Sequence, residues 1–250
     1  VTGEIIEKGH LGISQGVIDY VGSSAPEKQY TNKINLNGKH IYPGFIALNS
    51  TLGLVEVDAV RASDDESEIG IFNPNIRSII AYNAESKIVE TMRMNGVLLA
   101  QVTPRGGVVS GSSSVVQLDA WNWEDAAIKT DEGIHVNWPS AYSRASRWAP
   151  GPRTLSPSTT YLSNVERIKS VFHNAKNYLN DTNKEDLRLS SMQGLFNGTQ
   201  TLYLHLNNKR QIQDASSFFK SLGIEKVVLV GAREAHQIPE FLKEHNILVV

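Results

Sequence analysis

In the last third of the chain, short apolar runs typical of buried strands alternate with apolar positions spaced three or four residues apart. The runs predict strands and the wider spacing predicts amphipathic helices. The expected order is helix 162–179, strand 202–206, helix 212–222, strand 227–231, helix 238–242 and strand 247–250. Elements that alternate in this way form a parallel α/β sheet with right-handed crossovers. The periodicity fits both an open doubly wound sheet and a closed (β/α)8 barrel.

The first 42 residues instead carry short apolar runs that glycines interrupt. Apolar residues such as Ile13 and Ile18 on either side of Gly16 predict a β-hairpin. Residues 34–41 alternate apolar and polar side chains around a tight Asn-Gly turn. This part of the chain is therefore expected to be a small β unit.

The middle of the chain has fewer regular patterns. Residues 96–102 predict a further strand, whereas residues 106–114 are rich in glycine and serine. The second segment lacks the Gly-Lys-Ser/Thr ending of a P-loop and the Gly-x-Ser-x-Gly elbow of a serine hydrolase, so a turn between strands is expected. Four tryptophans lie within residues 121–148, which is typical of a core or interface and also fits a stacking platform for a ligand.

The most specific stretch is residues 38–53, Gly-Lys-His-Ile-Tyr-Pro-Gly-Phe-Ile-Ala-Leu-Asn-Ser-Thr-Leu-Gly. It resembles the start of the barrel in the amidohydrolase superfamily, where a proline-glycine turn leads into the first barrel strand. The similarity is greatest to the imidazolonepropionase-like members, in particular the exported ones. This resemblance implies a (β/α)8, TIM-like barrel at residues 43–250, incomplete at its C-terminal side, after a small N-terminal β-sandwich unit at residues 1–42.

In the amidohydrolase family the first barrel strand ends in His-x-His, and the two imidazoles hold a catalytic metal ion. Here Asn49 and Thr51 occupy the two positions. His205 matches the fifth-strand histidine of the family, whereas no histidine directly follows Val230 on the next strand. The resemblance therefore implies a degenerate metal motif, with no catalytic residues, no bound metal and no cofactor.

A barrel that lacks these ligands is expected to be a pseudoenzyme that acts as a non-catalytic interaction subunit. Two alternatives stay open. One is an active amidohydrolase with an atypical single zinc or iron site that includes His205. The other is a small-ligand-binding module whose contacts come from the candidate residues His205, Asn49, Thr51, Trp121 and Trp123.

Composition removes several other functional classes. The net charge of −2 gives no reason to expect nucleic-acid binding, and no apolar run approaches the roughly 20 residues needed to cross a bilayer. The chain has no cysteine, which excludes disulfides, thiolate metal ligands and a cysteine nucleophile. Export to the periplasm is implied by the resemblance alone, and the absence of cysteine permits it.

The chain finishes in the apolar run 247–250, which is expected to be an edge strand of the parallel sheet. An exposed edge of this kind invites aggregation unless another segment covers it. We therefore expect a piece of a longer protein, or an oligomer or complex with another protein chain such as a related amidohydrolase.

Overall fold

The computed structural model describes residues 3–144, 155–178 and 185–250. By their contacts, the residues of the chain fall into two compact units, Val1–Pro43 and Gly44–Val250. No helix in the described residues is long and apolar enough to cross a membrane.

The first unit contains a hairpin formed by β1 (His10–Ser14) and β2 (Val17–Gly22), which pair antiparallel. Its turn residues Gln15 and Gly16 have φ of 51° and 76°, the left-handed values that a two-residue hairpin turn favours. The predicted hairpin is thus confirmed. No further strand pair lies among the described residues of this unit, so the two packed sheets of the expected β-sandwich are not seen.

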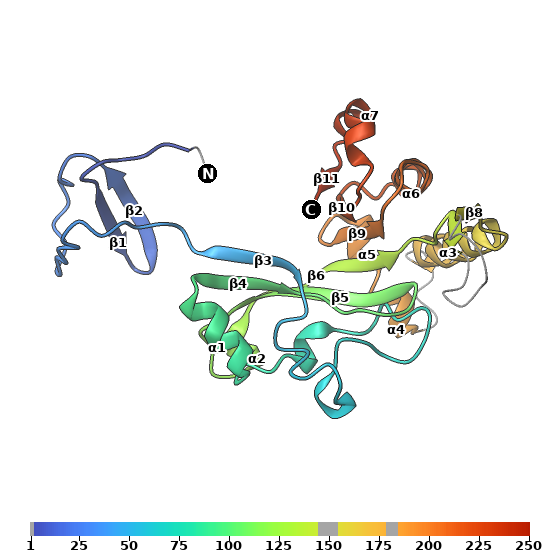
Figure 1. Cartoon of the computed structure of the whole chain (residues 1–250), viewed down its shortest axis with the longest axis horizontal. Coiled ribbons are helices and arrows are strands. Elements are labelled where there is room, and N and C mark those ends of the chain that lie inside the picture. Colours follow the sequence, from blue (N-terminus) through green and yellow to red (C-terminus); the bar gives the residue numbers. More distant parts are fainter. Residues whose placement is uncertain (1–2, 145–154, 179–184) are drawn as a thin grey trace. The chain divides into compact units, whose positions relative to one another are not determined.

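The second unit is built on a seven-stranded sheet in the order β11-β10-β9-β6-β5-β4-β3, which curls into a half-barrel (Figure 1). Its strands are β3 (Phe45–Ser50), β4 (Val97–Val102), β5 (Val109–Gln117), β6 (Ala127–Asn137), β9 (Thr201–Leu206), β10 (Val227–Gly231) and β11 (Leu248–Val249). β3 pairs with β4 in parallel, and β6, β9, β10 and β11 pair in parallel in turn. β5 runs antiparallel to both of its neighbours. The predicted α/β class is confirmed, and the curled sheet agrees with an incomplete barrel.

Helices α3 (Tyr161–Tyr178), α6 (Lys209–Ser221) and α7 (Pro239–Glu244) follow the predicted order. The apolar stripes of α3 and α6 pack on one face of the sheet, against apolar residues of β6, β9 and β10. Within this helix-covered core, Phe219 of α6 lies edge-on to Phe172 of α3, with ring centroids 4.7 Å apart. The strands that carry the candidate site are therefore supported on their helix-covered face by a close-packed apolar layer.

Shorter elements complete the second unit. They are the 3-10 helices η1 (Arg61–Ser63), η2 (Ser78–Ala81) and η3 (Ala235–Gln237), the helices α1 (Lys87–Met94), α2 (Trp123–Ala126), α4 (Leu187–Ser190) and α5 (Gln193–Phe196), and the antiparallel pair β7 (Tyr142–Arg144) and β8 (Leu155–Pro157). Residues of α1 and η2, such as Val89 and Ile79, form a second core with β4 and β5. The sheet is thus supported by two cores, one for each half of its strand order.

The Gly/Ser-rich segment is largely a strand, so the turn expected at residues 106–114 is wrong from residue 109 onward. Ser112 and Ser113 of β5 are buried, and their hydroxyls donate to carboxylates of β6, Asp131 at 2.8 Å and Glu132 at 2.7 Å. Polar side chains are stable inside a sheet when they have cross-strand partners of this kind. Because its buried residues 110–114 are serine and glycine, the segment shows no alternation of apolar and polar residues.

Candidate functional site

The sheet has one face covered by helices and an opposite face that carries polar side chains. On β9, Leu204 belongs to the helix-covered core, so alternation places Tyr203 and His205 on the opposite face. The same alternation on β6 places His135 there. Hydrogen bonds join these residues to others from β3, β4, β5 and the loop after β4. We call the connected set the interior network: Asn49, Gln101, Arg105, Ser113, Glu132, His135, Tyr203 and His205.

Two histidines at the centre of the interior network contact each other directly. Nδ1 of His135 lies 2.9 Å from Nε2 of His205, and Nε2 of His135 lies 2.8 Å from Oγ of Ser113. His135 is fully buried and stacks on Tyr203, with 4.6 Å between ring centroids. His205 is half-buried near the C-terminal end of β9, the strand end at which barrels of this type carry their sites.

Glu132 anchors the other end of the interior network. Its carboxylate accepts hydrogen bonds from Gln101 Nε2 at 2.6 Å, from Ser113 Oγ at 2.7 Å and from the Tyr203 hydroxyl at 3.1 Å. The residue is only 5% exposed. A buried carboxylate is costly unless donors satisfy its oxygens, and here three do.

Burial keeps the two imidazoles uncharged. It lowers the pKa of His135 well below 6.5, with smaller contributions in the same direction from His205 and from the positive charge of Arg105. Burial also lowers the pKa of His205 to about 4, again with a contribution from the positive charge of Arg105. Burial and the charge of Glu132 raise the pKa of Tyr203, so its hydroxyl keeps the proton that it donates. At neutral pH both histidines are therefore neutral.

Neutral imidazoles fix the direction of every bond in the chain of donors. The single O–H of Ser113 donates to Glu132, so its oxygen accepts from Nε2–H of His135. Because a neutral imidazole carries one N–H, Nδ1 of His135 then accepts from Nε2–H of His205. The Nδ1 atom of His205 is left as an acceptor, and no hydrogen bond reaches it from the described residues.

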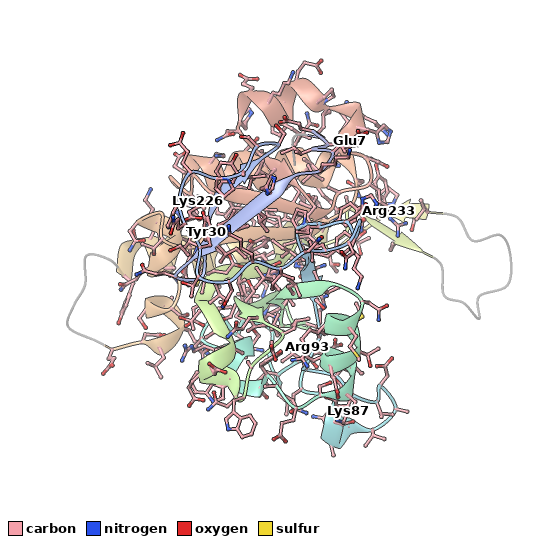
Figure 2. The ribbon with its side chains drawn as sticks, turned by 90° about the vertical axis from the view of Figure 1, so that its left-hand side faces the viewer. Glu7, Tyr30, Lys87, Arg93, Lys226 and Arg233 are labelled. Atoms are coloured by element: carbon pink, nitrogen blue, oxygen red, sulfur yellow. The ribbon has the colours of Figure 1, made fainter. Side chains whose placement is uncertain are left out.

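Asn49 and Arg105 are bound to each other at the β3 side of the interior network. Arg105 donates from Nη1 to Oδ1 of Asn49 at 2.5 Å and from Nη2 to the Asn49 carbonyl at 2.7 Å. The backbone N–H of Asn49 donates to Oε1 of Gln101 at 3.0 Å. Arg105 is half-buried, and burial lowers its pKa. Other cations, such as Lys226 and Arg233 labelled in Figure 2, are exposed.

The three described tryptophans do not gather in one place. Trp121 is 87% exposed, Trp123 packs against the second core, and Trp138 is buried in the helix-covered core. Trp148 lies outside the described residues. The described tryptophans therefore form no common stacking platform, and Trp138 has the core role that is typical of a large indole.

The remaining candidates are not members of the interior network. Trp123 begins α2, directly before β6, whereas His205 pairs with Asn137 at the opposite end of β6. At about 3.3 Å per strand residue, the two ends are about 30 Å apart. Thr51 lies in the turn after β3, where its carbonyl accepts from the N–H of Leu54 at 2.9 Å. Of the candidate binding residues, Asn49 and His205 belong to the interior network, and a ligand role for the others stays a prediction.

A cavity of about 550 Å³ lies beside the C-terminal end of β6. Its lining includes Asn137, Tyr142, Asn164 and Arg167. No residue of the interior network lines it. The cavity is thus a neighbour of the network, and Arg167 is its cationic side chain.

No family model matches the chain, and no curated protein matches it. Among solved structures the chain is similar to an amidohydrolase from Thermotoga maritima MSB8, with a TM-score of 0.79 and 20% sequence identity. The match covers 96% of this chain and 64% of that chain, so this chain spans less than two thirds of the length of its neighbour. At this low identity, the structural match establishes the fold alone. The fold is amidohydrolase-like, as the resemblance of residues 38–53 predicted. The similarity to imidazolonepropionase-like members stays a prediction.

An amidohydrolase fold implies a divalent metal centre, and the side chains here do not fit one. Two nitrogens bound to one tetrahedral zinc ion at about 2.0–2.1 Å would lie about 3.3 Å apart, and both would direct a lone pair at the ion rather than share a proton. His135 and His205 are instead joined nitrogen to nitrogen at 2.9 Å, and the Asn49 side-chain oxygen is bound to a guanidinium. In the described part of the chain, no three His, Cys, Asp or Glu side chains converge on a possible metal position.

Sequence reasoning identified Asn49 and His205 but missed the residues that connect them. The segments 135–137 and 203–205 both read polar-apolar-polar, a signal that places their polar residues on one face of each strand. The contact between His135 and His205, however, joins positions 70 residues apart through the pairing of β6 with β9. No local pattern reports such a pairing. Arg105 follows β4 without any motif of its own.

Proposed function

We propose that this chain is a non-catalytic binding protein with an amidohydrolase-like fold, in which a hydrogen-bonded network replaces the metal centre. The observation that carries the proposal is the pair of bonds from Arg105 to Asn49, the residue that stands where the resembling family has its first histidine. A fixed guanidinium repels a divalent cation, and an amide oxygen is a weaker ligand than an imidazole for zinc or iron.

His205 gives the second support. Its Nε2–H donates to His135, so this nitrogen has no lone pair to offer a metal ion. To free it, the protein would have to break a bond to a fully buried ring. Only Nδ1 of His205 then remains, and one protein ligand does not make a metal site.

Metal content of the purified protein tests the proposal. Protein produced with added zinc and iron is expected to hold far less than one equivalent of either after gel filtration, measured by elemental analysis. His205→Ala is expected to leave this low content unchanged, as is the control His173→Ala, which alters an exposed histidine of α3. A stoichiometric metal that depends on His205, with chelator-sensitive turnover of cyclic amides or dipeptides, would instead establish the rival function, an active amidohydrolase with an atypical single-metal site.

A second candidate function is that of a docking subunit, because the β3 edge of the half-barrel exposes apolar side chains. Phe45, Ile46 and Leu48 are 69%, 56% and 53% exposed, and in the described part of the chain β3 has a strand neighbour on one side only. Such an edge is stable in solution when another strand covers it. We propose a further amidohydrolase-like chain as this partner, since a closed barrel pairs its first strand with a parallel one.

A further inference from the structure

We propose that the interior network binds a small carboxylic acid that also carries an N–H or O–H donor. Arg105 takes the carboxylate, and Nδ1 of His205 accepts the donor. The inference rests on the proposed function, because a metal ion between these groups would change the role of both. Three observations in the described residues support it: the cation has no carboxylate partner, an imidazole nitrogen has no donor, and the two groups are near each other.

Arg105 is a half-buried cation without a carboxylate partner. No Asp or Glu oxygen of the described residues lies within 4.0 Å of its guanidinium, whereas Arg77 is paired with Asp131 at 2.7 Å. Glu66 acts on Arg105 only from a longer range. Two of the five guanidinium N–H groups bind Asn49. Because a desolvated charge is costly unless it is paired, the remaining N–H groups favour an anion.

His205 contributes an acceptor of fixed orientation. The donor chain from His205 through His135 and Ser113 to Glu132 commits Nε2 of His205 as a donor. Nδ1 of the same ring therefore keeps its lone pair, and the His205 residue is partly exposed. The ring cannot rotate to exchange its two nitrogens without breaking the bond to buried His135.

Asn137 links the two groups in space. It pairs with His205 in the register of β6 and β9, and its Nδ2 lies 3.4 Å from the carbonyl oxygen of Gly106, the residue after Arg105. The charge of Arg105 also acts on the pKa of both His135 and His205. The cation and the acceptor therefore lie near one another, at the C-terminal end of β6.

The chemistry of the two groups selects the class of ligand. A guanidinium fork matches a carboxylate through two parallel hydrogen bonds. A phosphate dianion would need further positive charge, and the neutral histidines do not supply it. A neutral Nδ1 accepts, so the ligand must donate from an N–H or O–H group. N-acyl amino acids and hydroxy acids share this pair of groups.

N-acetylglycine is a suitable probe, because it carries a carboxylate and an amide N–H on neighbouring atoms. Its neutral counterpart N-acetylglycinamide keeps the amide and loses the charge. We expect N-acetylglycine to bind with a Kd on the order of millimolar, because so small a ligand makes few contacts. We expect N-acetylglycinamide to bind at least tenfold more weakly. The measurement is the change in imidazole ¹H–¹⁵N shifts of His135 and His205 during titration of the whole chain.

Matched arginine variants locate the binding. Arg105→Gln is expected to weaken N-acetylglycine at least tenfold, and Arg105→Lys, which keeps the charge but not the fork, is expected to weaken it less. Arg233→Gln, at an exposed site, is expected to change nothing. Equal binding of the acid and the amide by the unmodified protein would overturn the inference whatever the variants do. So would loss of binding in Arg167→Gln with retention in Arg105→Gln, which would move the site to the neighbouring cavity.

Metal analysis of the same samples separates this inference from the proposed function. Metal-free protein that fails to bind N-acetylglycine removes the inference and leaves the proposed function standing. Binding that appears only after zinc is added contradicts both. If inorganic phosphate binds the site as strongly as N-acetylglycine does, the site accepts oxyanions in general. That outcome would overturn the assignment of a carboxylic acid as the ligand class.

Discussion

Asn49 combines two properties that few residues share. Its backbone has φ of 50°, a left-handed value that asparagine adopts far more readily than most residues with a Cβ atom. Its side-chain oxygen also accepts a hydrogen bond from Arg105. Asn49 therefore anchors the guanidinium at the position where the resembling family has its first histidine.

Removal of the Arg105 charge is expected to raise the pKa of His205. Burial is the larger cause of the low value of about 4 and stays in place, so the pKa rises without reaching the ordinary 6.5. The check is an NMR pH titration of His205 in Arg105→Gln, with Arg233→Gln as the exposed control. An unchanged pKa in Arg105→Gln would mean that the guanidinium does not act on the network.

His205 also makes the stability of the fold depend on pH. Its pKa is lower in the folded chain (about 4) than in the unfolded chain (near 6.5), so the unfolded state binds more protons between these values. The contribution of the neutral ring is complete above pH 6.5 and is lost as pH falls toward 4. We expect the free energy of unfolding to fall between pH 7 and 5, and His205→Gln to reduce this fall by about 1–2 kcal/mol.

Urea unfolding at the two pH values measures the effect. His173→Gln is the control, because its ring is exposed on α3. If His205→Gln and His173→Gln show the same dependence on pH as the unmodified chain, the coupling of His205 to folding is refuted.

At the scale of single residues, the sequence predicted where side chains lie along a strand but not which side chains they contact. His205 could be placed near a strand end because 202–206 alternates apolar and polar residues and matches a known strand of the resembling family. Its bond to His135 depends on the register between β6 and β9, which tertiary packing sets. Ser113 gave no signal because its burial is balanced by hydrogen bonds rather than by apolar contacts.

Among the elements, β5 shows why periodicity alone misses part of the sheet. Strands β9 and β10 are buried through apolar contacts, and their composition predicts them directly. β5 is also buried, yet its residues 110–114 are serine and glycine, which are typical of turns. Its middle depends on cross-strand bonds to β6, whereas Val109 and Val116 near its two ends belong to the two apolar cores.

Two buried serines test this view of β5. Ser113→Ala removes a hydroxyl that joins His135 to Glu132, which leaves buried groups unsatisfied and is expected to cost about 1–3 kcal/mol of unfolding free energy. Ser216→Ala in α6 is the matched control, because that hydroxyl is buried without a hydrogen-bond partner among the described residues. It is expected to be neutral or stabilising.

Both variants are compared with the unmodified chain by urea unfolding at pH 7. The slope against denaturant is expected to stay constant, because neither change alters the surface exposed on unfolding. A Ser113→Ala protein as stable as Ser216→Ala would contradict a structural role for the hydrogen bonds of the interior network.

For the whole molecule, the decisive information was the resemblance of residues 38–53 rather than periodicity. Alternating strands and helices predicted a parallel sheet without deciding between an open sheet and a barrel. The seven strands form a half-barrel, and β3 and β11 lie at its two edges. Among the described residues, the two edges leave hydrogen-bonding groups unpaired on one side of each strand, and open edges of this kind favour pairing with a further strand.

Charge on the β3 edge tests the docking function. Under that proposal the full protein is a defined oligomer in size-exclusion chromatography with light scattering. Ile46→Lys is expected to shift it toward monomer, since a lysine on an edge strand opposes pairing with a second apolar edge. Ile128→Lys on central strand β6 is the control, because Ile128 is 58% exposed and Ile46 is 56% exposed. A clean monomer for the unmodified protein, or equal dissociation in both variants, would remove the docking function and leave the ligand-binding function of the interior network to account for the fold.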